Sequence, residues 1–164
     1  MLDAYYIAYR AVAIAASDII AMGAYPEGYL LNITHPDPTD QWFEKFTLGI
    51  NDFNDDYGTN LIGGDLTKGE LNISVTVFGK QFEKIIKRSG AKVDDDIYIS
   101  NALGLGKQGY ERYKKQILDF PNQYLKPKLL SIKTIKALQP FMNSAIDVSA
   151  VSYTHLRAHE TCHN

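Results

Sequence analysis

The sequence predicts a mixed fold of helices and strands, in the α/β (α+β) class. Apolar residues recur at helical spacing in residues 39–57, and residues 4–23 are apolar over almost their whole length. Residues 71–79 instead alternate between apolar and polar positions, which is typical of a half-buried strand. Because the two patterns interleave along the chain, we expect helices packed on a sheet.

The first part of the chain is predicted to alternate helix, strand and helix. Residues 4–23 hold three strongly polar positions, so this helix should be buried on most faces. Residues 28–34 have the composition of a strand. A second helix is expected from a cap at Thr39 or Asp40 to the glycine at Gly58.

The rest of the chain adds further strands and helices. Short strands are predicted at residues 59–64, 71–79 and 97–100. A helix of mixed charge should follow and end near Leu118, and prolines then divide one or two further helices. Residues 144–148 have the pattern of the entry to another strand.

Composition excludes several classes of protein. At 164 residues, the chain has room for one domain, or for one domain and the beginning of a second. A net charge of -2 without long basic runs argues against nucleic-acid binding. No apolar run has the length of a membrane span and no signal peptide is recognisable, so we expect a cytoplasmic protein that does not bind membranes.

Three aspartates occupy apolar surroundings. Asp18 lies inside the most apolar predicted helix, and Asp65 and Asp147 each follow a short apolar run. Buried carboxylates need a partner or a cation, and aspartates together with phosphates are the ligands that suit Mg²⁺. Solvated or turn aspartates would give the same pattern, so spacing alone leaves both interpretations open.

Two further positions suit a phosphate. Gly64, next to Gly63, allows the backbone to approach a ligand closely. Arg88 could bind phosphate through two hydrogen bonds, although a basic residue near a strand is more often a solvated surface group. Neither position belongs to a Walker A or dinucleotide-binding motif.

Four stretches, taken in order, resemble the thiamine-monophosphate kinase family. They are SDIIAMGA at residues 17–24, LIGGDLTKG at 61–69, RSGAK at 88–92 and SAIDVS at 144–149. Their order and spacing are similar to the family's over residues 4–149. One departure is Leu66, where the family usually has threonine.

The resemblance implies a fold, a reaction and a set of site residues. The fold would be the N-terminal domain of the aminoimidazole ribonucleotide synthetase-like superfamily, with a mixed sheet and flanking helices, incomplete at both ends. The reaction would be the ATP-dependent phosphorylation of thiamine monophosphate to thiamine diphosphate, by in-line transfer with Mg²⁺. By position, the metal ligands would be Asp18, Asp65 and Asp147, and the nucleotide contacts Gly64, Arg88 and Ser149.

The resemblance also predicts the organisation of the chain. Residues 1–120 would be a partial ATP- and Mg²⁺-binding domain, residues 121–149 a linker and the start of a second domain, and residues 150–164 a non-native tail. The full-length protein would be a homodimer, and the fragment alone would be inactive. Two alternatives remain open: another ATP-using member of the superfamily, of the selenophosphate-synthesising or hydrogenase-maturation type, and a non-catalytic dimerisation module.

Overall fold

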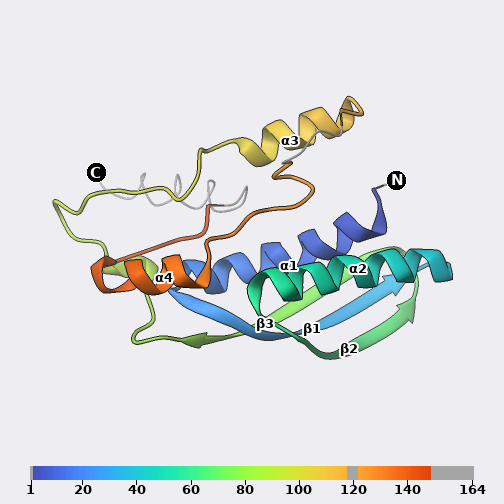
Figure 1. The fold of residues 1–164 in the computed structure, drawn as a ribbon, viewed down its shortest axis with the longest axis horizontal. Coiled ribbons are helices and arrows are strands. Elements are labelled where there is room, and N and C mark those ends of the chain that lie inside the picture. Colours follow the sequence, from blue (N-terminus) through green and yellow to red (C-terminus); the bar gives the residue numbers. More distant parts are fainter. Residues whose placement is uncertain (1, 118–121, 149–164) are drawn as a thin grey trace, which may run out of the picture.

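The structure, a computed structural model, describes residues 2–117 and 122–148. A three-stranded sheet lies on one side and the helices on the other (Figure 1). The main elements are α1 (Ala4–Ala21), β1 (Ala24–His35), α2 (Asp40–Tyr57), β2 (Leu61–Lys68), β3 (Asn72–Gln81), α3 (Leu105–Lys114) and α4 (Ile132–Leu138), with short 3₁₀ turns η1 (Arg88–Gly90) and η2 (Gln139–Phe141). The predicted mixed class of helices and strands is confirmed.

The central strand is β1, which pairs in parallel with β2 and antiparallel with β3. Its side chains alternate: Tyr29, Leu31 and Ile33 are buried beneath the helices, whereas Asn32 is exposed on the opposite side. That second side, the open face of the sheet, carries none of the helices (Figure 1). The strands predicted at residues 28–34, 59–64 and 71–79 therefore exist, and each extends beyond its predicted end.

The core lies between the sheet and the two long helices α1 and α2. Gly49 of α2 lies so close to α1 that a Cβ atom built there would stand 2.2 Å from the Tyr5 carbonyl oxygen. Glycine therefore permits the close approach of the two helices. The caps also follow the sequence, because the Thr39 hydroxyl accepts from the Trp42 N–H and Gly58 ends α2 in the left-handed conformation.

By length and composition alone, the helix α1 is long and apolar enough to cross a membrane, which corrects the expectation from the sequence that no apolar run has that length. In the structure it packs against the sheet and α2, and seven of its side chains are buried. This is the arrangement of a core helix in a globular domain, which passes the same test of length and composition.

Two predicted strands are absent from the part of the chain that the structure describes. Residues 97–100 and 144–148 are irregular. Ile97 and Tyr98 are 94% and 86% exposed, so this segment has the composition of a strand but no neighbour to pair with. Residues 144–148 instead begin at Ser144, whose hydroxyl bonds the backbone carbonyl oxygens of Lys87 and Arg88.

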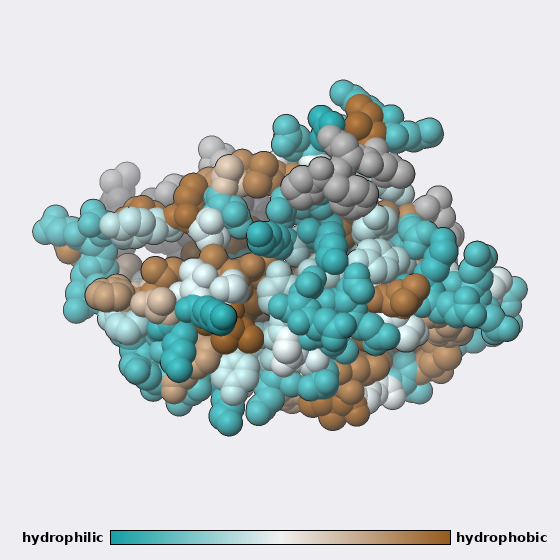
Figure 2. Space-filling model, viewed as in Figure 1, coloured by the Kyte–Doolittle hydropathy of each residue, from teal (hydrophilic) through white to brown (hydrophobic). Residues whose placement is uncertain are grey.

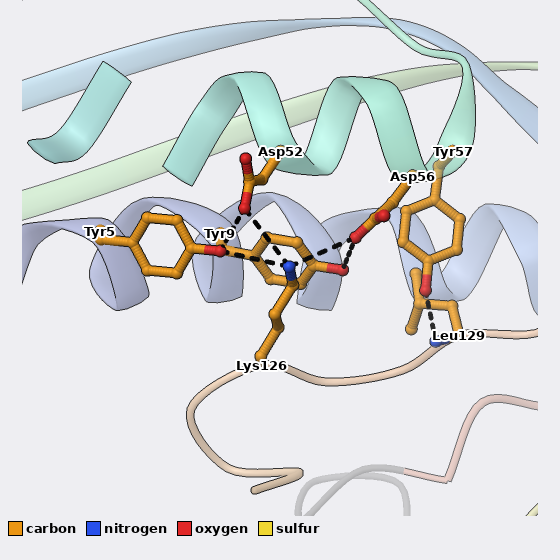
Figure 3. Close-up of polar contacts among 7 residues, drawn as sticks. All are labelled: Tyr5, Tyr9, Asp52, Asp56, Tyr57, Lys126 and Leu129. Atoms are coloured by element: carbon orange, nitrogen blue, oxygen red, sulfur yellow. Dashed lines mark hydrogen bonds and ion pairs between the residues drawn. The ribbon is translucent and has the colours of Figure 1, made fainter. Parts of the chain in front are cut away.

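Residues 122–148 return over α1 and α2 and are fixed to them at several points. Figure 3 shows the Lys126 ammonium between the two aspartates of α2, at 3.4 Å from Asp52 and 3.5 Å from Asp56. The hydroxyl groups of Tyr5 and Tyr9 on α1 donate to the same two carboxylates. This ionic cluster joins both helices to the returning segment, and Leu125 beside it is fully buried.

Candidate functional site

Asp18 is exposed, which corrects the expectation of a buried carboxylate. It lies near the C-terminal end of α1, one turn from Ile14 and one turn from Met22, which are themselves 45% and 41% exposed. These three positions share the side of the helix that faces away from the sheet. An apolar sequence around a residue therefore did not fix the direction of its side chain.

Asp147 lies beside Asp18, although the two are far apart in the sequence. Burial raises the pKa of the Asp147 carboxyl, the negative charge of Asp18 raises it further, and a hydrogen bond from Ser17 acts in the opposite direction. The Ser17 hydroxyl is also 2.7 Å from the Ile14 carbonyl oxygen, so two acceptors compete for its single proton. The two carboxylates therefore repel each other, and a cation between them would stabilise both in their charged form.

The segment that carries Asp147 is anchored to the loop that carries Arg88. The Ser144 hydroxyl lies 3.0 Å from the Lys87 carbonyl oxygen and 2.6 Å from that of Arg88. Gly90 packs against the backbone of this segment, since a Cβ atom there would stand 2.0 Å from the Asn143 carbonyl oxygen. Arg88 itself is exposed. Its loop thus lies next to the carboxylate pair.

Gly64 and Asp65 lie elsewhere, in the middle of β2 rather than at a strand end. Asp65 is paired with Asn32 and exposed on the open face. Asn32 is eight residues along β1 from Ala24, about 26 Å at roughly 3.3 Å per residue. Asp65 is therefore separated from Asp18 both along the sheet and by its face.

Gly64 has a structural reason to be glycine. Its φ is 156°, and a Cβ atom would stand 1.8 Å from the Leu31 carbonyl oxygen of β1. The backbone of β2 approaches β1 too closely there for a side chain. This requirement exists without any ligand.

The structure thus brings together Asp18, Asp147 and the loop of Arg88, but not Asp65. Within residues 2–117 and 122–148, no three histidine, cysteine, aspartate or glutamate side chains are grouped to hold a metal ion. Ser149 lies outside the described residues. The sequence interpretation missed Ser17, whose place directly before Asp18 was a usable signal.

The first half of the chain matches a known protein family. Residues 1–81 match the family described as AIR synthase related protein, N-terminal domain. This segment contains α1, β1, α2, β2 and β3, the complete helix-and-sheet layer described above. This segment of the chain therefore matches the N-terminal domain of the AIR synthase related family.

Within that class, the chain is a homologue of the thiamine-monophosphate kinases. It is 34% identical over 151 residues to the thiamine-monophosphate kinase of Buchnera aphidicola from Acyrthosiphon pisum, an alignment covering 87% of this chain and 47% of the relative. The chain thus spans about half the length of the curated relatives it matches.

Solved structures agree with this placement. The thiamine monophosphate kinase of Aquifex aeolicus has a TM-score of 0.81 and 26% identity, over 90% of this chain and 52% of that one. A second structure, AaThiL complexed with AMPPCP and TMP, gives the same TM-score and identity over 50% of its own chain. The hydrogenase maturation protein HypE, at a TM-score of 0.67 and 17% identity, shares the fold alone.

Proposed function

We propose that this chain is part of an enzyme that transfers the γ-phosphoryl group of ATP to thiamine monophosphate. An oxygen of the substrate phosphate forms a bond to the γ-phosphorus, the bond to the β-γ bridging oxygen breaks, and the products are thiamine diphosphate and ADP. The observation that carries the proposal is the homology to thiamine-monophosphate kinases over 87% of this chain. The structure related at 26% identity, with AMPPCP and TMP bound, supports the same pair of ligands. We place the enzyme in the cytoplasm.

Asp18 and Asp147 fit a divalent cation of the Mg²⁺ type. They supply hard oxygen donors next to each other, and their mutual repulsion disfavours the pair without a cation. A bound Mg²⁺ would neutralise charge on the transferred and leaving phosphates. The residues of this chain would hold the phosphates in place, with the exposed Arg88 able to reach a phosphate oxygen from the adjacent loop.

Gly64 and Asp65 would act from the open face of the sheet, and Ser149 remains a proposed nucleotide contact. We propose that a second copy of the chain brings these β2 residues to the carboxylate pair of the first, in a homodimer. The open face supports this idea because Ile62, which packs over Gly28, is 64% exposed and Phe78 is 47% exposed. Figure 2 shows one group of hydrophobic side chains near the middle of the lower edge of the molecule, between polar ones. Covering such a patch would remove apolar surface from water.

The metal and nucleotide assignments are tested by calorimetric titration of the 164-residue chain with ATP. We expect binding that requires Mg²⁺ and weakens about tenfold or more in Asp18→Asn and Asp147→Asn, the typical loss when a charged hydrogen-bonding or metal-binding group is removed. Asp55→Asn, an exposed aspartate of α2, is the matched control and should bind as wild type does. Equal binding in EDTA, or in the two variants, would show that these carboxylates hold no metal.

The reaction itself needs a separate measurement. The gene, read together with its flanking genomic sequence, should give a product that converts thiamine monophosphate to thiamine diphosphate, measured by chromatography. The 164-residue chain alone should not convert thiamine monophosphate to thiamine diphosphate. A product that binds Mg²⁺ and ATP but phosphorylates no thiamine monophosphate would favour another ATP-using member of the family. A product that dimerises without binding ATP would favour a non-catalytic module.

A further inference from the structure

A buried glutamine joins the three segments that carry the carboxylate pair and the loop of Arg88. Gln139 opens η2, directly after α4, and is 1% exposed. Its Nε2 donates to the carbonyl oxygen of Gly23 at 2.9 Å and to that of Lys84 at 2.5 Å. Its Oε1 accepts from the Glu83 N–H at 3.3 Å. Both amide protons and the amide oxygen are therefore used.

Each of these bonds reaches a different part of the site. Gly23 lies in the turn that ends α1, two residues beyond its last residue, so this bond fixes the end of the helix that carries Asp18. The bonds to Glu83 and Lys84 fix the loop that leads to Arg88. Gln139 itself begins the segment that runs to Asp147 eight residues later.

Further contacts also join the turn after α1, the loop that leads to Arg88 and the segment that runs to Asp147. Ile86, in the loop, donates its N–H to the Met22 carbonyl oxygen at 2.9 Å and is 3% exposed. Ser144 bonds the carbonyl oxygens of Lys87 and Arg88. Among these contacts, Gln139 is the residue of the third segment whose side chain bonds both the turn after α1 and the loop. Three segments distant in sequence thus meet at one amide group.

We infer that Gln139 is a positioning residue, whose side-chain amide holds Asp147, Asp18 and the loop of Arg88 in the relative positions that a metal-bound nucleotide requires. This inference rests on the proposed function for the identity of the ligand. It does not rest on it for the geometry, because the three hydrogen bonds are properties of the chain itself. Outer groups that orient metal ligands typically change metal affinity about 10- to 100-fold when they are removed.

The first arm of the test needs no ligand. Gln139→Met keeps the length and volume of the side chain but removes all three hydrogen bonds. Hydrogen exchange should then become faster at the Glu83 amide and across residues 143–148, while α2 exchanges as in wild type. Gln123→Met is the matched control, because the Gln123 side chain accepts from the Lys128 N–H within its own segment. Unchanged exchange at Glu83 and residues 143–148 would overturn the inference.

The second arm measures the Mg²⁺ concentration at which ATP binding is half-maximal, well below the melting temperature of each variant. Gln139→Met should raise it about tenfold, whereas Gln123→Met should not. Ile135→Val, a core change in α4, should lower the melting temperature without altering the Mg²⁺ requirement. A Gln139→Met protein that melts earlier but keeps the wild-type requirement would show that the residue is merely structural.

Two outcomes separate this inference from the proposed function. If the wild-type chain binds no Mg²⁺ and ATP, the proposed function fails, and the exchange measurements still decide whether Gln139 joins the segments.

If Gln139→Met does not fold, Gln139→Glu replaces it in both arms. That variant keeps the shape and the oxygen that accepts from Glu83, but turns an acceptor towards two carbonyl oxygens. It should show the same faster exchange and higher Mg²⁺ requirement, and wild-type behaviour in both would refute the role.

Discussion

Replacing Lys126 with methionine should loosen the attachment of residues 122–148 to the helical layer. The ammonium group lies 3.4 Å and 3.5 Å from the Asp52 and Asp56 carboxylates, 3.2 Å from the Tyr5 hydroxyl and 4.6 Å from the centre of the Tyr9 ring. Methionine keeps most of the aliphatic stem but none of these contacts. It also leaves two like charges one turn apart on α2.

The size of the effect follows from exposure. The lysine side chain is 34% exposed and both aspartates are 48% exposed, so each ion pair is screened by water and contributes at most about 1 kcal/mol. The cation-π contact contributes about 0.5–1 kcal/mol and the hydrogen bond to Tyr5 a similar amount. Allowing for the side-chain entropy of an ordered lysine, we expect a loss of about 2 kcal/mol.

The assay is thermal and urea unfolding of matched variants. A loss of about 2 kcal/mol should lower the melting temperature by roughly 4–8 °C in a chain of this size. Lys128→Met, an exposed lysine two residues away, should change stability by less than about 0.5 kcal/mol. The loss of stability in Lys126→Met should also be smaller in 1 M salt, because the Debye length is then about 3 Å and the ion pairs are screened. If Lys126→Met and Lys128→Met unfold alike, the cluster does not attach the segment.

Three further predictions follow from the helices. Gly49→Ala should lower the free energy of unfolding by more than about 2 kcal/mol, because the new methyl group forces α1 and α2 apart. At Gly58 a methyl group would meet open space but the φ is 61°, so Gly58→Ala should cost about 1 kcal/mol. Similar losses for the two variants in urea unfolding would contradict the packing argument. Burial raises the pKa of Tyr9, so the unfolded chain ionises first, near about pH 10. Stability should therefore fall above that pH, and less steeply in Tyr9→Phe, as followed by melting temperature. Asp3 caps α1, and its hydrogen bond from Lys45 lowers the Asp3 pKa, so its stabilisation should be lost as pH falls below about 4; Asp3→Ala should cost about 1 kcal/mol at neutral pH and little in acid.

Local signals predicted the elements well where a cap, a turn residue and a periodic run agreed. The helix from Asp40 to Tyr57 is the best case, because Thr39 and Gly58 mark its ends in the sequence and in the structure. Residues 97–100 failed for the opposite reason. A strand is defined by a neighbour, and the local composition that suggested one cannot supply it.

The candidate site was predicted only in part. The sequence pointed to Asp18 and Asp147, which the structure brings close enough for the charge of Asp18 to raise the pKa of Asp147. It did not reveal that Asp18 is exposed or that Asp65 faces away from the helices, because both depend on how the layers pack. Gln139, between a leucine and a proline, carried no signal at all, since a buried amide is recognised only by its distant partners.

The place of β1 in the middle of the sheet has a consequence during synthesis. Both of its neighbours are made after it, and the edge of β1 that pairs with β3 stays open until the ribosome has passed Gln81, 46 residues beyond His35. At about 5–20 residues per second this takes roughly 2–9 s. For that interval the nascent polypeptide exposes a strand with an open edge behind an apolar helix, the kind of segment that chaperones cover and that otherwise aggregates.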